Sequence, residues 1–167
     1  MPQSLDPPAD AVDRLRRIRA LAQLDDTTLD AIGREGEWLR IDAGELLFRE
    51  NDRSDAAYFV LRGRVRVVQS EIDGGERVIG ERGAGETIGE IGIVADLPRT
   101  ASVRALRDTD VVRIARDAFD RLVESDPKAV VPLMRVIAER LAEATRGGGA
   151  GAGRVAVLAM VCGTHGD

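Results

Sequence analysis

The stretch from Gly85 to Ala105, GETIGEIGIVADLPRTASVRA, decides how the rest of the chain is interpreted. Its glycines, among them Gly89 and Gly92, allow the backbone to approach a ligand closely and to point N–H groups into one space. A helical turn that begins near Gly89 favours an anion at its N-terminus, because the first N–H groups of a helix have no partner within it. The stretch therefore predicts a loop that binds an anion.

Two charged residues in this stretch narrow the chemistry of the anion. Arg99 offers a fork of donors that matches phosphate oxygens, and Thr100 adds a hydroxyl and a backbone N–H. Glu90 repels a phosphate, but its carboxylate accepts a hydrogen bond from a neutral hydroxyl such as the 2′-OH of a ribose. A phosphate beside a ribose hydroxyl indicates a nucleotide. On composition alone, a glycine-rich surface loop with a Glu–Arg ion pair is the open alternative.

The segments around this stretch alternate with the period of two that is typical of β-strands. Short strands are predicted over residues 38–41, 46–48, 58–61, 65–68, 78–79, 101–105 and 111–114. Asp73-Gly74-Gly75 is a hairpin signal. Turn signals recur about every 8–12 residues, which favours a sandwich or barrel over a sheet of alternating strands and helices.

Helical periodicity is predicted at both ends of this β-region. Apolar residues have helical spacing over residues 10–22, a second short helix follows up to Gly33, and further helices are expected over 116–124 and 127–146. Residues 1–9 are expected to be a flexible lead-in, 10–146 one domain, and 147–153 a glycine-rich linker. Residues 154–167 contain an apolar run and are interpreted as the start of a truncated following domain or a tail.

Composition argues against several classes of function. The net charge of −5 disfavours non-specific nucleic-acid binding. Cys162 and His165 are the only residues of their types, so neither a metal centre nor a Cys/His catalytic pair is expected. There is no Gly-x-Ser-x-Gly or Walker pattern, and we expect no catalysis by this chain. No signal peptide and no apolar run of roughly 20 residues is found, which predicts the cytosol or the cytosolic side of a membrane-associated protein.

The run Gly89-Glu90-Ile91-Gly92, followed by Pro98-Arg99-Thr100-Ala101, resembles the phosphate-binding cassette of cyclic nucleotide-binding domains. The preceding segments 43–45, 58–61 and 63–67 resemble that family too, and the likeness extends over about residues 24–145. It implies a mainly β fold, a double-stranded β-helix (jelly roll or β-roll) of about eight strands with N- and C-terminal helices. The ligand-binding residues it implies are Gly89, Glu90, Ile91, Gly92, Arg99, Thr100 and Ala101.

The resemblance also implies roles for these residues. The position of Glu90 binds the ribose 2′-hydroxyl, that of Arg99 pairs with the cyclic phosphate, and backbone amides matching Ile91, Gly92 and Thr100 assist. The chain departs from the family at Asn51, where glycine is usual; asparagine tolerates a positive φ, so the turn is expected to survive. Ile88 stands where an aromatic residue is common. Cyclic AMP is the favoured ligand, with cyclic GMP as the second candidate and no metal.

The chain is accordingly interpreted as a regulatory module that senses a cyclic nucleotide and transmits closure of its C-terminal helices to a downstream domain. The segment from Arg154 to Leu158 resembles the junction after the nucleotide-binding domains in bacterial patatin-like phospholipases related to neuropathy target esterase. Two alternatives are the effector part of a cyclic-AMP-responsive transcription factor without its DNA-binding part, and a degenerate domain that binds nothing. Homodimerisation through the long helix is left open.

Overall fold

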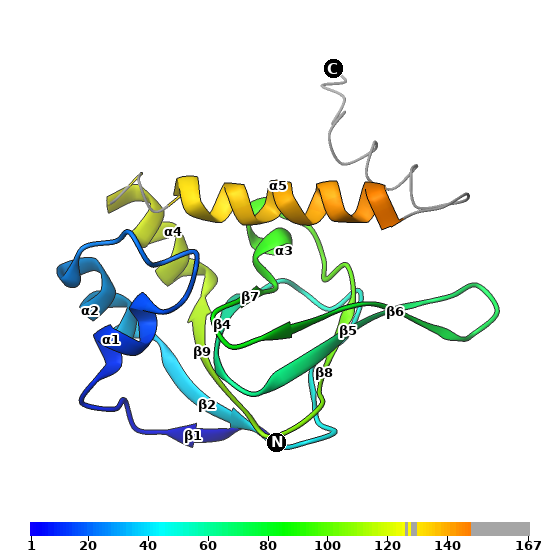
Figure 1. Ribbon diagram of the computed structural model, residues 1–167, viewed down its shortest axis with the longest axis horizontal. Helices are drawn as coiled ribbons and strands as arrows, with labels where there is room; N and C mark the ends of the chain where they lie inside the picture. Colours follow the sequence, from blue (N-terminus) through cyan, green and yellow to red (C-terminus); the bar gives the residue numbers. More distant parts are fainter. Residues whose placement is uncertain (126, 128–129, 148–167) are drawn as a thin grey trace.

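Two antiparallel sheets form the centre of the computed structural model, which describes residues 1–125, 127 and 130–147 (Figure 1). The strands are β1 (Gln3–Leu5), β2 (Glu37–Ile41), β3 (Leu46–Phe48), β4 (Ala56–Arg62), β5 (Arg64–Ser70), β6 (Glu76–Gly83), β7 (Thr87–Ile88), β8 (Ser102–Ala105) and β9 (Thr109–Ala115). The helices are α1 (Ala11–Arg16), α2 (Asp26–Glu35), α3 (Glu90–Val94), α4 (Arg116–Ser125) and α5 (Val130–Gly147).

The two sheets have strand orders β1-β2-β9-β4-β7 and β3-β8-β5-β6, and every pairing is antiparallel. This confirms the predicted mainly β fold with flanking helices. In Figure 1, α1, α2 and α4 lie on one side of the sheets, whereas α5 runs over α3 at the top of the view. The β-roll therefore presents the cassette helix α3 directly to α5.

The central strands β4 and β9 of the five-stranded sheet are buried on both faces. On β9, Val111 packs inside the roll against Val60 and Val65, whereas the next residue, Val112, packs under the helices with Trp38. Successive side chains of a strand point to opposite faces, so both members of the Val-Val pair are buried in different cores. Each such fully buried aliphatic side chain contributes about 1.5–3 kcal/mol. The sheet is thus a rigid support for the loops at its end.

The N-terminal helices differ from their predicted lengths. The helix expected over residues 10–22 ends at Arg16, and turns follow as far as Leu24. The α2 helix starts after Asp25, whose carboxylate accepts a hydrogen bond from the Thr28 N–H at 2.8 Å. It continues through Gly33, the expected stop, to Glu35. Gly33 is instead buried within α2, and a Cβ added to Gly33 would lie 3.5 Å from Leu15 Cδ1.

The first residues of the chain are paired with the five-stranded sheet. The lead-in expected to be flexible contains β1, which pairs with β2 in the register Gln3↔Arg40 and Leu5↔Trp38. Hydrogen bonds between backbone groups order this segment. Because these bonds do not depend on apolar side chains, the sequence shows no hydrophobic periodicity here. The expected linker 147–153 and the segment 154–167 lie, apart from Gly147 at the end of α5, outside the described residues. Within the described part, no helix has the length and apolar character needed to cross a membrane.

Candidate ligand-binding site

The predicted cassette forms the turn from β7 into α3. Gly89 stands at the N-cap of α3 with φ of 76°, a left-handed conformation that favours glycine. A Cβ on Gly89 would lie 2.3 Å from Arg99 Nη1, and a Cβ on Gly92 would lie 2.0 Å from Ser54 Oγ. Both glycines are therefore required because side chains of the protein approach the backbone closely, whereas the close approach of a ligand expected from the sequence stays a prediction.

Arg99 is held from several directions and is only 3% exposed. Its Nη2 donates to the Ala56 carbonyl at 2.8 Å and to Asp55 Oδ1 at 3.1 Å, while Nη1 donates to the Gly89 carbonyl at 3.0 Å. The guanidinium carbon lies 4.1 Å from the centre of the Phe48 ring, a cation–π contact. The side chain is thus fixed beneath the N-terminus of α3.

The electrostatics around Arg99 are shared with Asp55. Burial lowers the pKa of Arg99, and the nearby Tyr58 and Asp55 oppose that shift. Asp55 also accepts from Arg113 Nη2 at 2.8 Å. Burial raises the pKa of the Asp55 carboxyl, but the hydrogen bond and charge of Arg113 outweigh burial, so that its pKa lies below the ordinary value. Asp55 is therefore an ionised bridge between two arginines.

The backbone around Arg99 is also fixed. The Asn51 N–H donates to the Arg99 carbonyl, and the Arg99 N–H donates to the Asp52 carbonyl, both at 2.8 Å. Asn51 has φ of 69°, which confirms that asparagine accommodates the positive φ expected there. Gln69 Nε2 donates to the Thr100 carbonyl at 2.9 Å. The end of the cassette is therefore attached to two separate parts of the roll.

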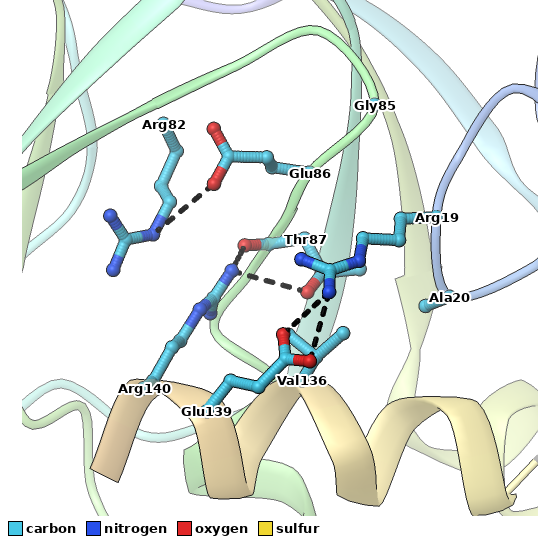
Figure 2. A pocket seen from close by; sticks show the side chains of 9 residues that line it. All are labelled: Arg19, Ala20, Arg82, Gly85, Glu86, Thr87, Val136, Glu139 and Arg140. Atoms are coloured by element: carbon cyan, nitrogen blue, oxygen red, sulfur yellow. Dashed lines mark hydrogen bonds and ion pairs between the residues drawn. The ribbon is translucent and has the colours of Figure 1, made fainter. Parts of the chain in front are cut away.

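Glu90 is completely buried, and its partner comes from α5. Arg140 forms an ion pair with Glu90 Oε1, and its Nη2 donates to the Thr87 carbonyl and lies 3.4 Å from Thr87 Oγ1 (Figure 2 shows the Thr87 contacts). Sequence reasoning missed Arg140. One signal was available in the sequence. Arg140 lies four residues after Val136, which packs against the core, so both residues lie on the same face of the helix. An arginine on a buried face needs a partner.

Beside this ion pair lies a cavity of about 60 Å³ between the roll and α5 (Figure 2). Its lining residues are Arg19, Ala20, Arg82, Gly85, Glu86, Thr87, Val136, Glu139 and Arg140. Pockets for small organic ligands usually have volumes of about 300–1,000 Å³. With α5 in this position, the cavity is too small for a nucleotide.

The structure brings most of the predicted site residues together. Glu90, Ile91 and Gly92 form the first part of α3, with the guanidinium of Arg99 against Gly89 at its start. Thr100 and Ala101 follow on the way into β8. Among the described residues, three buried polar atoms in and next to the cassette have no hydrogen-bond partner: Ser54 Oγ, Glu90 Oε2 and Arg99 Nε.

Unpartnered buried polar atoms cost free energy, so they indicate atoms that a ligand is able to satisfy. In the part of the chain that the structure describes, no group of three or more His, Cys, Asp or Glu side chains is placed to hold a metal ion.

Comparison with known proteins agrees with this geometry. The sequence profile described as "Cyclic nucleotide-binding domain" matches residues 38–126, more than half of the chain. The chain belongs to the cyclic nucleotide-binding domain family.

Among curated proteins, the chain is similar to Lysophospholipase nte1 of Neurospora crassa, with 39% identity over 105 residues. That alignment covers 63% of this chain but only 7% of the relative, so the chain spans a small part of the relative's length.

Two solved structures are also similar. One is the regulatory domain of Toxoplasma gondii PKA in its co-crystal structure with cAMP, with a TM-score of 0.62 and 28% identity, covering 68% of this chain and 43% of that chain. The other is the Catabolite Activator Protein of Thermus thermophilus, with a TM-score of 0.70 and 27% identity, covering 76% of this chain and 60% of that chain.

Proposed function

We propose that this chain is a regulatory module that binds a cyclic nucleotide at the cassette and transmits the binding through α5 to an attached domain. The observation that carries the proposal is that the carboxylate of Glu90 and the guanidinium of Arg99 are both buried at the N-terminus of one short helix. Each retains one polar atom without a partner among the described residues. The family supplies the ligand class for this pair.

In the proposed complex, the cyclic phosphate lies against Arg99 and the backbone N–H groups of Ile91, Gly92 and Thr100, and Ala101 lies at the edge of the site. A phosphate adds a second anion beside a guanidinium that Asp55 already neutralises in part. The ribose 2′-hydroxyl donates to Glu90. Because Arg140 now contacts Glu90, α5 has to yield space before the sugar enters. The ligand shifts this equilibrium only by its differential affinity for the two positions of α5.

Cyclic AMP is the proposed ligand and cyclic GMP the second candidate. The regulatory domain of Toxoplasma gondii PKA, solved with cAMP, supports this order at 28% identity. The hydroxyl of Thr100 supports cyclic GMP as the second candidate, because it is able to accept a hydrogen bond from the 2-amino group of guanine. Titrating both nucleotides against the same sample decides between them.

The attached domain is proposed to be a lipid hydrolase in a cytosolic setting, because the curated relatives are lysophospholipases of which this region is a small part. Catalysis would then belong to another part of the longer protein, which this chain regulates. Homodimerisation also remains a proposal. It is favoured by the exposed Val131 and Met134 on α5, which are 61% and 46% exposed.

Isothermal titration calorimetry with cyclic AMP tests the proposed site. Arg99→Ala should weaken binding by about 2–5 kcal/mol, the usual loss when one partner of a buried charge pair is removed. Arg107→Ala is the matched control, since Arg107 is exposed and its side chain has no hydrogen bond or ion pair among the described residues. Absence of heat from the wild type with both nucleotides at millimolar concentration would refute the proposal.

A further inference from the structure

Two consecutive residues of α5 form ion pairs with other parts of the molecule. Arg140 reaches into the cassette, and Glu139 contacts Arg19 in the connection between α1 and α2. Arg19 Nη2 lies 2.9 Å from Glu139 Oε1 and 2.8 Å from Oε2, so both carboxylate oxygens are engaged. Figure 2 shows the Arg19 side chain reaching across the small cavity to α5.

The Arg19 end of this contact is anchored in the β-roll. The Arg19 N–H donates to the Gly85 carbonyl at 2.9 Å, and Gly85 N–H in turn donates to the Val60 carbonyl in β4 at 2.8 Å. The neighbours Ile18 and Ala20 are 1% and 2% exposed. The backbone of Arg19 therefore moves with the sheet, and only the other end of the contact is on a helix that has to move.

We propose that the Arg19–Glu139 ion pair is a strap that holds α5 over the cassette, so that the ligand site opens when this pair breaks. The cavity of about 60 Å³ beneath the strap is too small for a nucleotide. Arg140 of α5 also contacts Glu90 and Thr87, so entry of a ligand at Glu90 requires α5 to move away from them, which lengthens the Arg19–Glu139 distance. The strap resists that movement whichever ligand arrives, and its effect on binding rests on the proposed function.

The charges around the strap set its strength. Arg82, Glu86 and Arg140 line the same cavity, so Arg19 has a second carboxylate and two further guanidinium groups as neighbours. The side chains of Arg19 and Glu139 are 68% and 39% exposed, so water and salt screen the pair. Exposed ion pairs shift an equilibrium by about fivefold at most. A strap of this strength is released readily, and higher ionic strength should weaken it.

The first test measures the position of α5 without any ligand. Spin labels on cysteines at Arg62, at the end of β4, and Ala138, on α5, are introduced together with Cys162→Ser, and the distance between them is measured by pulsed electron paramagnetic resonance. Arg19→Glu should move the distribution toward longer distances. The charge swap Arg19→Glu with Glu139→Arg should restore the distribution of the parent protein.

Arg17→Glu is the matched control, because Arg17 is an exposed arginine two residues earlier whose side chain has no hydrogen bond or ion pair among the described residues. It should leave the distances unchanged. If Arg19→Glu does not fold, Glu139→Gln removes the same contact from the other side. Unchanged distances in the folded variants, or an equal change in Arg17→Glu, would overturn the strap.

The second test measures association of a fluorescent cyclic AMP analogue by stopped flow. Arg19→Glu replaces attraction by repulsion, so we expect association to be about three- to tenfold faster. The charge swap should return the rate to that of the parent. An unchanged rate in a variant that binds the analogue would overturn the strap. A protein that binds no nucleotide but shows the expected distance changes retains the strap and loses the proposed function.

Discussion

Before any ligand binds, the side chain of Arg99 already has hydrogen-bond acceptors on several sides. Two carbonyls, one carboxylate and two aromatic rings hold it while it is 3% exposed. Such an arrangement limits its rotamers before binding, so less side-chain entropy is lost when a phosphate arrives. Its unpartnered Nε is the donor that remains for the ligand. Substitution by lysine would keep a charge but lose the planar fork.

Glu90→Gln tests the role of the carboxylate. An amide oxygen still accepts from a ribose hydroxyl, but a hydrogen bond to a neutral acceptor is weaker than one to a carboxylate, so cyclic AMP should bind about 1–3 kcal/mol more weakly. Calorimetry with cyclic AMP and its 2′-deoxy analogue measures the loss. The wild type should bind cyclic AMP more tightly than the 2′-deoxy analogue. Equal affinity of the wild type for both ligands would contradict the assignment of Glu90 to the ribose.

Asp55→Asn tests the bridge between the two arginines through its pH dependence. Because the native state lowers the pKa of Asp55 below the ordinary value of about 3.9, this carboxylate stabilises the fold above that pH and the stabilisation is lost as pH falls through the lower native pKa. The urea midpoint should therefore be lower in the variant at pH 7, and the difference should narrow below about pH 4.

Fluorescence of the single tryptophan, Trp38, which is 4% exposed, provides the readout for this comparison. Asp13→Asn controls for the loss of one carboxylate, since Asp13 is exposed and in no ion pair among the described residues. A difference between the wild type and Asp55→Asn that stays constant from pH 7 to pH 3 would argue against the bridge.

At the scale of single residues, the sequence predicted those residues whose neighbours in the chain already indicate a ligand-binding loop. Glu90 and Arg99 stand in a glycine-rich context, and the structure places both at α3. Asp55 was not predicted, because an aspartate in a turn cluster has an ordinary local role. Arg140 was not predicted, because its partner lies 50 residues away in the sequence. The register of Arg140 after Val136 indicates only that it needs a buried partner, and folding decides which residue that partner is.

Among the elements, α1 contributes one fully buried side chain to the core. Leu15 is completely buried and faces Gly33 of α2. Leu15→Ala should lower the free energy of unfolding by about 2–5 kcal/mol, because the cavity left behind cannot close fully. Urea unfolding followed by Trp38 fluorescence measures it. Arg17→Ala is the control and should change stability by no more than about 0.5 kcal/mol.

The strands were predicted better than the helices, for a physical reason. Alternation places each strand residue on one face or the other, so the pattern survives in β4, β5 and β9. After α1, the turns from Arg17 to Leu24 bury Ile18, Ala20, Leu21 and Leu24. Those positions imitate the apolar stripe of a helix, so periodicity alone extended the helix beyond Arg16. Tertiary contacts decide this boundary, including the hydrogen bond from Arg19 N–H to Gly85.

For the whole molecule, binding should be visible as stabilisation. A ligand that binds only the folded state at one hundred times its Kd adds about 2.7 kcal/mol, which for a domain of this size corresponds to a rise in Tm of about 10 °C. Differential scanning calorimetry with cyclic AMP measures this shift. The matched ligand control is 5′-AMP, which has the same base and sugar without the cyclic phosphate, and it should raise Tm much less.

A shift of equal size with Arg99→Ala would place the bound nucleotide outside the cassette. The mainly β class followed from the alternating strands and their turn spacing, and the β-roll from the family resemblance, whereas the position of α5 over α3 was not predicted. That position depends on contacts between α5 and distant residues, including Arg19 and Thr87.

The packing of Ser54 against Gly92 constrains the order in which this site is able to evolve. An alanine at position 92 would bring its Cβ to 2.0 Å from Ser54 Oγ and 2.8 Å from Ser54 Cβ, so it cannot be accepted while the serine is present. A prior change of Ser54 to glycine removes both of these atoms and leaves the Leu97 carbonyl oxygen, 3.0 Å from the added Cβ, as a tight contact to which the backbone has to adjust. Substitutions at these two positions should therefore be epistatic, with the change in the turn before β4 preceding the change in the cassette helix in any viable lineage.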